Sequence, residues 1–254
     1  MVPIVSSSGE CSDMQLSSFI DYLEAPSTSE HWLYLKDWHF QLEFADYGAY
    51  ETPSYFASDW MNEYWLAKAD AEQADYRFLY LGPKGSMTSL HADVLRSFSW
   101  SANIAGRKRW LLIPPGKEAT LLSESDLREV SPERLAKAGV IDIAQEAGEV
   151  LFVPSNWYHQ VHNEELTLSL NHNSFNGANF HVVWAYALQR LADVESEIAH
   201  TRSLFAEEWP SQCQKVLRAD IGVDFQELLD ILAFIEKQRP IIAAQIVRTR
   251  NTRP

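Results

Sequence analysis

The sequence is poor in cysteine and has no long apolar run. Its two cysteines, Cys11 and Cys213, lie far apart and form no CxxC pair, so they can build neither a zinc finger nor a disulfide framework. No apolar run approaches the roughly 18–20 residues that a membrane helix needs. The opening residues, MVPIVSSSGECSD, lack the basic and apolar regions of a secretory signal. We therefore expect a cytoplasmic protein with no membrane partner, and the nucleus is the alternative location.

Basic residues are also scarce. The chain carries 21 Lys and Arg against 35 Asp and Glu, which gives a formal net charge of −14. Such a chain repels phosphate backbones unless it has a local basic patch, so a nucleic-acid partner is disfavoured. A basic protein or a lysine-bearing loop would be attracted instead. Many soluble proteins are acidic simply for solubility, so the charge alone does not identify a partner.

Apolar and aromatic residues are plentiful, and the middle of the chain has the pattern of a β protein. The 254 residues suit one large domain or one domain with an appendage, and nine Trp and twelve Phe indicate broad aromatic packing. From Tyr76 to Asn173, short β-rich segments alternate with turns such as Gly82–Ser86. Seven or eight short strands predict a small antiparallel barrel or double-sheet jelly roll. The segments WYHQVHN and LTLSLNHN are expected to form a hairpin across Asn163–Glu165.

Helices are predicted on both sides of this β region. Ser12–Glu24 has helical apolar spacing and is followed by a break, EAPSTSE, and a strand, HWLYLKDWHF. Ser58 or Asp59 can cap a helix. After Asn179 the pattern predicts two longer amphipathic helices, at 182–204 and 224–240, whose apolar stripes could pack on the barrel or on a second copy. The expected domains are an N-terminal lead with a short helix at 1–30, a β core at 31–176 and a helical region at 177–254.

One pair of residues in the β region points to metal chemistry. His91 and Asp93 lie two positions apart, so on an extended segment their side chains share one face. An imidazole and a carboxylate make two thirds of the 2-His-1-carboxylate triad, which holds Fe(II) and leaves three positions open. An H-x-D pair is frequent by chance. This one follows a strand and a glycine-rich turn, where barrels mount ligands, and Lys108 on the next strand but one could pair with a carboxylate at the inner wall.

A third ligand can come from the stretch between Gly148 and Asn173. It offers His159, His162 and His172. His159 and His162 are three positions apart and face opposite sides of a strand, so only one of them can reach the metal. The residues alone leave the choice open.

Three motifs in this order resemble one enzyme family. They are HAD at 91–93, GRKRWLLIPP at 106–115 and GEVLFVPSNWYH at 148–159. The order is similar to that of the jumonji-C (JmjC) family of Fe(II)- and 2-oxoglutarate-dependent oxygenases, over about Tyr76 to Asn173. The resemblance implies a mostly β fold with helical additions, a double-stranded β-helix of the jelly-roll or cupin type followed by C-terminal helices.

The resemblance also implies the ligands of the metal and the cofactors. The cofactors would be Fe(II), 2-oxoglutarate as cosubstrate and O2. His91, Asp93 and His159 match the family's iron ligands. His162 is then expected to pack or hydrogen-bond nearby, and His172 to lie at a strand end beside the pocket.

The resemblance assigns further residues to 2-oxoglutarate. Lys108 matches the lysine that anchors the C5 carboxylate, a charge-assisted bond that is strong when water is excluded. Thr88 matches a hydroxyl donor to the same carboxylate. Some relatives carry an Asn where this chain has Ser99 or Ser101, so either serine or water could complete the site. Two further residues match pocket-lining positions, Tyr80 and Asn171.

The family performs more than one reaction. C-hydroxylation is favoured over N-methyl-lysine demethylation because the chain has no cysteine-rich reader module. Segments such as LYLKDWHF and SDWMNEYW are similar to those of family members that hydroxylate a lysine of the translation termination release factor. The resemblance therefore implies a protein substrate, this release factor, and a homodimer through the C-terminal helices. The alternatives are demethylation, action on RNA and a non-catalytic cupin-like binding module.

Overall fold

The computed structural model describes residues 1–25, 31–68 and 75–239. These residues form two compact units. Residues 1–25, 31–54 and 75–174 make a β unit, and residues 55–68 with 175–239 make a helical unit.

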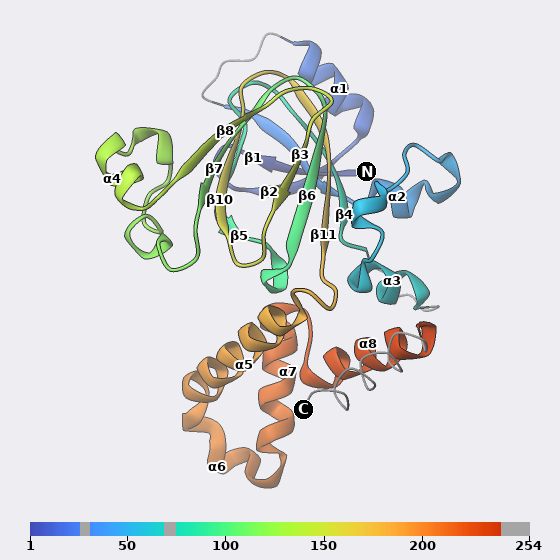
Figure 1. Cartoon of the computed structure of the whole chain (residues 1–254), viewed down its shortest axis with the longest axis vertical. Helices are drawn as coiled ribbons and strands as arrows, with labels where there is room; N and C mark the ends of the chain where they lie inside the picture. Colours follow the sequence, from blue (N-terminus) through green and yellow to red (C-terminus); the bar gives the residue numbers. More distant parts are fainter. Residues whose placement is uncertain (26–30, 69–74, 240–254) are drawn as a thin grey trace, which may run out of the picture. The chain divides into compact units, whose positions relative to one another are not determined.

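The β unit is built around eight consecutive barrel strands. Their order in the chain is β4 (Arg77–Gly82), β5 (Met87–Ala92), β6 (Phe98–Ala105), β7 (Lys108–Ile113), β8 (Ile141–Gln145), β9 (Val150–Val153), β10 (Tyr158–Asn163) and β11 (Thr167–Ser174). They lie in two antiparallel sheets. The larger has the order β2-β1-β3-β4-β11-β6-β9, where β1 (Val2–Ser6), β2 (Cys11–Met14) and β3 (Leu33–Trp38) come from the N-terminal segment. The smaller has the order β5-β10-β7-β8. Figure 1 shows β5, β7, β8 and β10 on one side of the barrel and β4, β6 and β11 on the other. This confirms the predicted mostly β, jelly-roll fold with helical additions.

The predicted hairpin between the last two barrel strands is wrong. β10 pairs with β5 and β7, whereas β11 pairs with β4 and β6 in the other sheet. The connection between them bonds to other loops: the N–H of Asn163 donates to Ser86 O and that of Glu164 to Arg107 O. A short polar loop suits a hairpin, but here it carries the chain from one sheet to the other.

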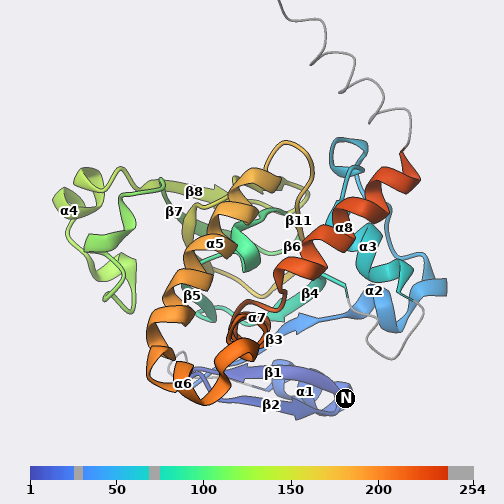
Figure 2. The same ribbon diagram turned by 90° about the horizontal axis from the view of Figure 1, so that it is seen from below.

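The N-terminal segment extends the larger sheet. β1 (Val2–Ser6) pairs with β2 (Cys11–Met14) on one side and with β3 (Leu33–Trp38) on the other. The following helix, α1 (Leu16–Glu24), therefore begins later than the predicted Ser12, and it lies against these strands (Figure 2). Phe19 of α1 packs with side chains of β1 and β3. Residues 26–30 of the expected break lie outside the described residues.

Strand β7 is buried on both faces, which fixes the direction of its side chains. Trp110 and Leu112 pack inside the barrel with Val153 and Val161. Leu111 and Ile113 point outward and are covered by the connection between β7 and β8, which contains α4 (Pro132–Lys137) and contributes the buried Leu121 and Leu127. By alternation, Lys108 shares the inner face with Trp110.

The helical unit contains four longer helices. They are α3 (Trp60–Ala67), α5 (Phe180–Glu197), α7 (Trp209–Ile221) and α8 (Phe225–Gln238). Asp59 caps α3, since its Oδ1 accepts from the N–H of Asn62 at 2.9 Å, which resolves the choice between Ser58 and Asp59. α5 ends at Glu197, short of the expected 204, and α7 was not predicted. Pro240, the expected end of the last helix, lies outside the described residues. No helix in the described part of the chain is long and apolar enough to cross a membrane.

Adjacent leucines in the β7–β8 connection test this packing. Leu121 is fully buried and Leu122 is 51% exposed. Leu121→Ala should lower the free energy of unfolding by about 2–5 kcal/mol, because it leaves a cavity under β7. Leu122→Ala should change it by no more than about 0.5 kcal/mol. Urea denaturation followed by circular dichroism measures both, and equal losses would contradict the packing described here.

Candidate metal and cosubstrate site

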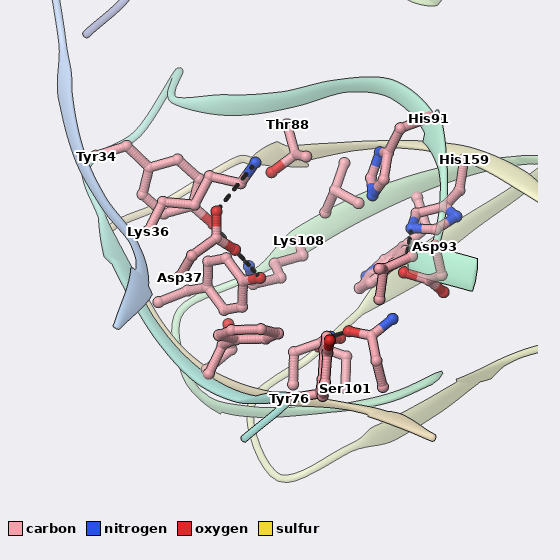
Figure 3. A pocket seen from close by; sticks show the side chains of 18 residues that line it. Tyr34, Lys36, Asp37, Tyr76, Thr88, His91, Asp93, Ser101, Lys108 and His159 are labelled. Carbon is pink, nitrogen blue, oxygen red and sulfur yellow. Dashed lines mark hydrogen bonds and ion pairs between the residues drawn. The ribbon is translucent and has the colours of Figure 1, made fainter. Parts of the chain in front are cut away.

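The three predicted iron ligands meet inside the barrel. His91 on β5 lies directly opposite His159 on β10, and their ring centroids are 4.2 Å apart. Asp93 follows β5, and its Oδ1 lies 3.9 Å from Nε2 of His159. One potential ligand atom from each residue lies within 4.8 Å of the other two, the one such group found among the described residues (Figure 3). Neighbouring strands thus bring two nitrogens and one carboxylate oxygen to a single point.

Both histidines present Nε2 to this point. Nδ1 of His91 lies 2.8 Å from Ser89 O, and Nδ1 of His159 lies 3.4 Å from Trp157 O. Because a carbonyl only accepts, each Nδ1 carries the proton and each Nε2 keeps its lone pair for a metal. Burial, together with the neighbouring His91, lowers the pKa of His159 to about 4. The ring is therefore neutral at physiological pH, as a metal ligand must be.

Asp93 is held in a way that fits a bound cation. Its Oδ2 is buried and has no hydrogen-bond partner among the described residues. A buried carboxylate oxygen without a partner is costly, and a divalent cation shared with the two histidines would satisfy it. Two imidazoles and one carboxylate are the donor set of non-haem Fe(II) oxygenases. The residues present therefore fit iron.

The turn that carries Asp93 has a strained backbone and is held to β10 by a side-chain contact. Leu95 and Arg96, which follow it, have φ values of 54° and 56°, in the left-handed region that non-glycine residues avoid. Such strain persists only where the surroundings enforce it. Arg96 donates from Nη2 to the hydroxyl of Tyr158 at 2.9 Å and lies over its ring. This contact ties the Asp93 turn to the strand that bears His159.

A cavity of about 280 Å³ extends from these ligands between the two sheets. A bulge in β5 shapes one wall, because the pairing with β10 shifts between His159↔His91 and Val161↔Thr88. Thr88 and His91 are three positions apart, yet both line the cavity as a result. All seven predicted site residues line it: His91, Asp93, His159, Lys108, Thr88, Tyr80 and Asn171.

Lys108 is a buried cation in this cavity. It is 3% exposed, and its Nζ donates to the hydroxyl of Tyr34 at 3.4 Å and lies 5.8 Å from the ring centre of Tyr80. No carboxylate in the described part of the chain forms an ion pair with it. Burial lowers its pKa to about 7. An ammonium in this position would gain from an anionic ligand, which would replace its lost hydration.

The other predicted cosubstrate residues already have partners or adjoin the cavity. The Tyr80 hydroxyl donates to Asp37 Oδ1 at 2.6 Å, and the Asn171 side chain donates to Asn173 Oδ1 at 3.1 Å. Thr88 also lines the cavity (Figure 3). Of the two serines left open by the sequence, Ser101 lines the cavity.

The rival histidines are buried elsewhere. His162 faces the outer side of β10, where its Nε2 lies 2.9 Å from Gln160 Oε1. Nε2 of His172 shares a hydrogen bond of 2.7 Å with the Tyr50 hydroxyl, and its ring stacks on Trp100 at 4.1 Å between centroids. Both side chains are therefore engaged outside the cavity.

One wall of the cavity is formed by residues that the sequence did not predict, apart from Tyr80. Tyr34, Lys36 and Asp37 reach it from β3, and Tyr76 and Phe78 reach it with Tyr80 from the β4 segment. The alternation of aromatic residues at 76, 78 and 80 was a usable signal for a shared face. No such signal marks Asp37, because adjacent residues of a strand normally face opposite sides and Lys36 comes directly before it.

Replacing His159 and His162 one at a time tests which of the two histidines binds the metal. His159→Ala should weaken Mn(II) binding by at least about 100-fold, since loss of an outer-sphere partner alone costs about 10–100-fold. His162→Ala should leave the affinity largely unchanged. Isothermal titration calorimetry measures both, with circular dichroism to check folding. Loss of binding in His162→Ala together with retention in His159→Ala would contradict the assignment.

Comparison with known proteins agrees with this geometry. Residues 78–174 match a family described as JmjC domain, hydroxylase. A Danio rerio protein named 2-oxoglutarate and iron-dependent oxygenase JMJD4 is 42% identical, over 89% of this chain and 57% of its own length. The Gallus gallus protein of that name is 45% identical, over 82% and 51%. An Arabidopsis thaliana protein named arginine-specific demethylase JMJ20 is 37% identical, over 85% and 51%.

The match covers most of this chain and a smaller share of each relative. The chain spans about half the length of the curated relatives it matches. The matched region contains all eight barrel strands, apart from the first residue of β4, and with them His91, Asp93, Lys108 and His159. Residues 78–174 are therefore a JmjC domain, and the chain is similar over most of its length to proteins that are named 2-oxoglutarate and iron-dependent oxygenases.

Proposed function

We propose that the chain is an Fe(II)- and 2-oxoglutarate-dependent protein hydroxylase. The observation that carries this proposal is one cavity with a His-Asp-His cluster and a buried lysine that lacks a carboxylate partner among the described residues. 2-Oxoglutarate has the matching chemistry, a keto acid that chelates a metal and a second carboxylate that needs a cation. Figure 3 shows Lys108 in the cavity, between the three predicted metal ligands and Tyr34.

The chain's residues would divide the work as follows. His91, Asp93 and His159 would hold iron, which together with 2-oxoglutarate and O2 would supply the chemistry for converting a C–H bond to C–OH. The two imidazoles are held in orientation because their Nδ1–H groups donate to backbone carbonyls. Lys108 would hold the distal carboxylate and so orient the cosubstrate. Trp110 and Val161 form an apolar part of the cavity wall, which would help to exclude water from the reacting atoms.

For the substrate we propose a lysine of the translation termination release factor. Support comes from the sequence segments that resemble lysyl hydroxylases of this factor and from the net charge of −14, which suits a basic target. Removal of an N-methyl group is the second candidate, favoured by the name of the Arabidopsis relative. Action on RNA and a non-catalytic binding role are weaker alternatives, since the chain is acidic and the whole ligand cluster is present.

Incubation with the release factor tests this function. Purified protein with Fe(II), 2-oxoglutarate and O2 should release succinate and add the mass of one oxygen atom to a lysine of the factor, as seen by mass spectrometry. His91→Ala should abolish both. Loss of a methyl group from a methylated peptide, without oxygen addition, would favour demethylation. Absence of succinate with the factor and with methylated peptides would contradict an oxygenase.

The pKa of Lys108 predicts a pH dependence for cosubstrate binding. A carboxylate prefers the protonated lysine, and the free pocket holds the Lys108 pKa at about 7. Affinity for 2-oxoglutarate should therefore fall as pH rises, to about tenfold weaker at pH 8 than at pH 6. The measurement is titration calorimetry with saturating Mn(II).

Lys108→Arg is the matched control. A guanidinium stays charged across this range, so the decline with pH should disappear even if the affinity itself changes. A wild-type affinity that does not change with pH, or an identical decline in Lys108→Arg, would contradict the role of Lys108.

Two further proposals accompany this function. We propose that the chain acts in the cytoplasm, with the nucleus as the alternative, and that it forms a homodimer through its C-terminal helices. The second is supported by exposed leucines of the helical unit, such as Leu188 and Leu229, which are 50% and 48% exposed.

A further inference from the structure

Strand β3 breaks its alternation where it borders the cavity. Its pairing with β4 shifts between Leu35↔Leu81 and Trp38↔Leu79, so β3 has one extra residue there, a β-bulge. Asp37 lies in the bulge with a φ of 60°, in the left-handed region that favours glycine. Adjacent residues of a strand normally face opposite sides, but Lys36 and Asp37 both line the cavity. Bulges and strained residues of this kind concentrate at functional sites.

The Asp37 carboxylate is available at the mouth of the cavity. Its side chain is 51% exposed. Oδ1 accepts from the Tyr80 hydroxyl at 2.6 Å, and Oδ2 lies 3.7 Å from Nζ of Lys36, beyond hydrogen-bonding distance. The carboxylates among the described lining residues are Asp37 and Asp93. Since Asp93 is one of the three predicted metal ligands, Asp37 is the lining carboxylate that can bind a substrate cation.

Aromatic side chains stand beside this carboxylate. Tyr80 is hydrogen-bonded to Asp37, and Tyr76, Phe78 and Tyr80 line the cavity at alternating positions, with the rings of Phe78 and Tyr80 6.4 Å apart. Aromatic faces attract alkylammonium and guanidinium groups, and a carboxylate gives such a group a charge-assisted hydrogen bond. The wall therefore has the chemistry for a cationic side chain.

Lys36 occupies the place that such a cation would take. It lines the cavity, its side chain is 25% exposed, and Figure 3 shows it beside Asp37 at the end of the cavity where Tyr34 lies. A partly exposed ion pair at 3.7 Å is weak. A ligand cation that forms a true hydrogen bond with Asp37 can therefore replace Lys36 at little cost.

We propose that Asp37 is a specificity-determining residue that binds the cationic head of a lysine-type side chain, with Lys36 as the internal cation that the substrate displaces. This inference rests on the proposed function and names how its substrate is selected. It assigns opposite effects to two neighbouring residues: Asp37 attracts the substrate cation, and Lys36 competes with it.

A binding measurement without turnover tests the proposal. The probes are Nα-acetyl-lysine N-methylamide and its neutral counterpart, Nα-acetyl-norleucine N-methylamide. The full chain is loaded with Mn(II) and 2-oxoglutarate, and paramagnetic relaxation of the probe protons in NMR titrations reports binding near the metal. The wild-type chain should bind the lysine probe at least about tenfold more tightly than the norleucine probe, as expected for a hydrogen bond to a charged group.

The variants should move this preference in opposite directions. Asp37→Asn should abolish the preference by weakening the binding of the lysine probe alone. Lys36→Met should strengthen the binding of the lysine probe several-fold, because it removes the competing cation. Tyr80→Phe removes the hydroxyl bonded to Asp37 but keeps the carboxylate, so it should retain the preference. A structural effect of Asp37 acting through Tyr80 would instead make Tyr80→Phe behave like Asp37→Asn.

Three outcomes would overturn the inference. They are equal binding of both probes by the wild-type chain, an unchanged preference in Asp37→Asn, and loss of the preference in Tyr80→Phe. Each can occur while Mn(II) and 2-oxoglutarate still bind, which leaves the proposed function standing. Failure of the wild-type chain to bind Mn(II) and 2-oxoglutarate would remove the proposed function and this inference with it.

Discussion

The site depends on the register in which β5 pairs with β10. That register sets His91 opposite His159, and the bulge in β5 then turns Thr88 to the same face. A slip of β10 by one residue would exchange its inner and outer faces, placing His162 inward and His159 outward. The inner position of Val161 in the barrel core and the outer hydrogen bond of His162 oppose such a slip. The apolar core thus selects which histidine can bind a metal.

Backbone strain and unbalanced charge both gather around this cavity. Among the described residues of the β unit, the non-glycine residues with positive φ are Asp37, Leu95, Arg96 and Asn156. Asp37 lines the cavity, Leu95 and Arg96 follow a ligand-bearing turn, and Asn156 lies in the turn before His159. Among the described residues, the cavity also holds a buried lysine that has no ion-pair partner, Lys108, and a buried carboxylate oxygen that has no hydrogen bond, Oδ2 of Asp93. The barrel core stabilises an arrangement that is unfavourable by itself and that ligands would complete.

The fold and part of the site followed from the sequence, for identifiable reasons. Strand alternation placed His91 with Asp93, the series of short strands predicted a barrel or jelly roll, and the family resemblance favoured His159 over His162. The short loop after Asn163 misled because loop length does not reveal which sheet the next strand joins. Asp37 was missed because a bulge breaks the alternation on which the reasoning relied. Helix α7 was missed although Trp209, Cys213 and Leu217, all buried, recur at helical spacing after a start with proline at the first turn.

Crystallography at the iron absorption edge tests the central claim most directly. Crystals grown without O2 and supplied with Fe(II) and 2-oxoglutarate would locate the metal by its anomalous signal. We expect one iron atom bonded to His91, Asp93 and His159, with the distal carboxylate of 2-oxoglutarate on Lys108. Iron held through His162, or 2-oxoglutarate bound without contact to Lys108, would contradict the account.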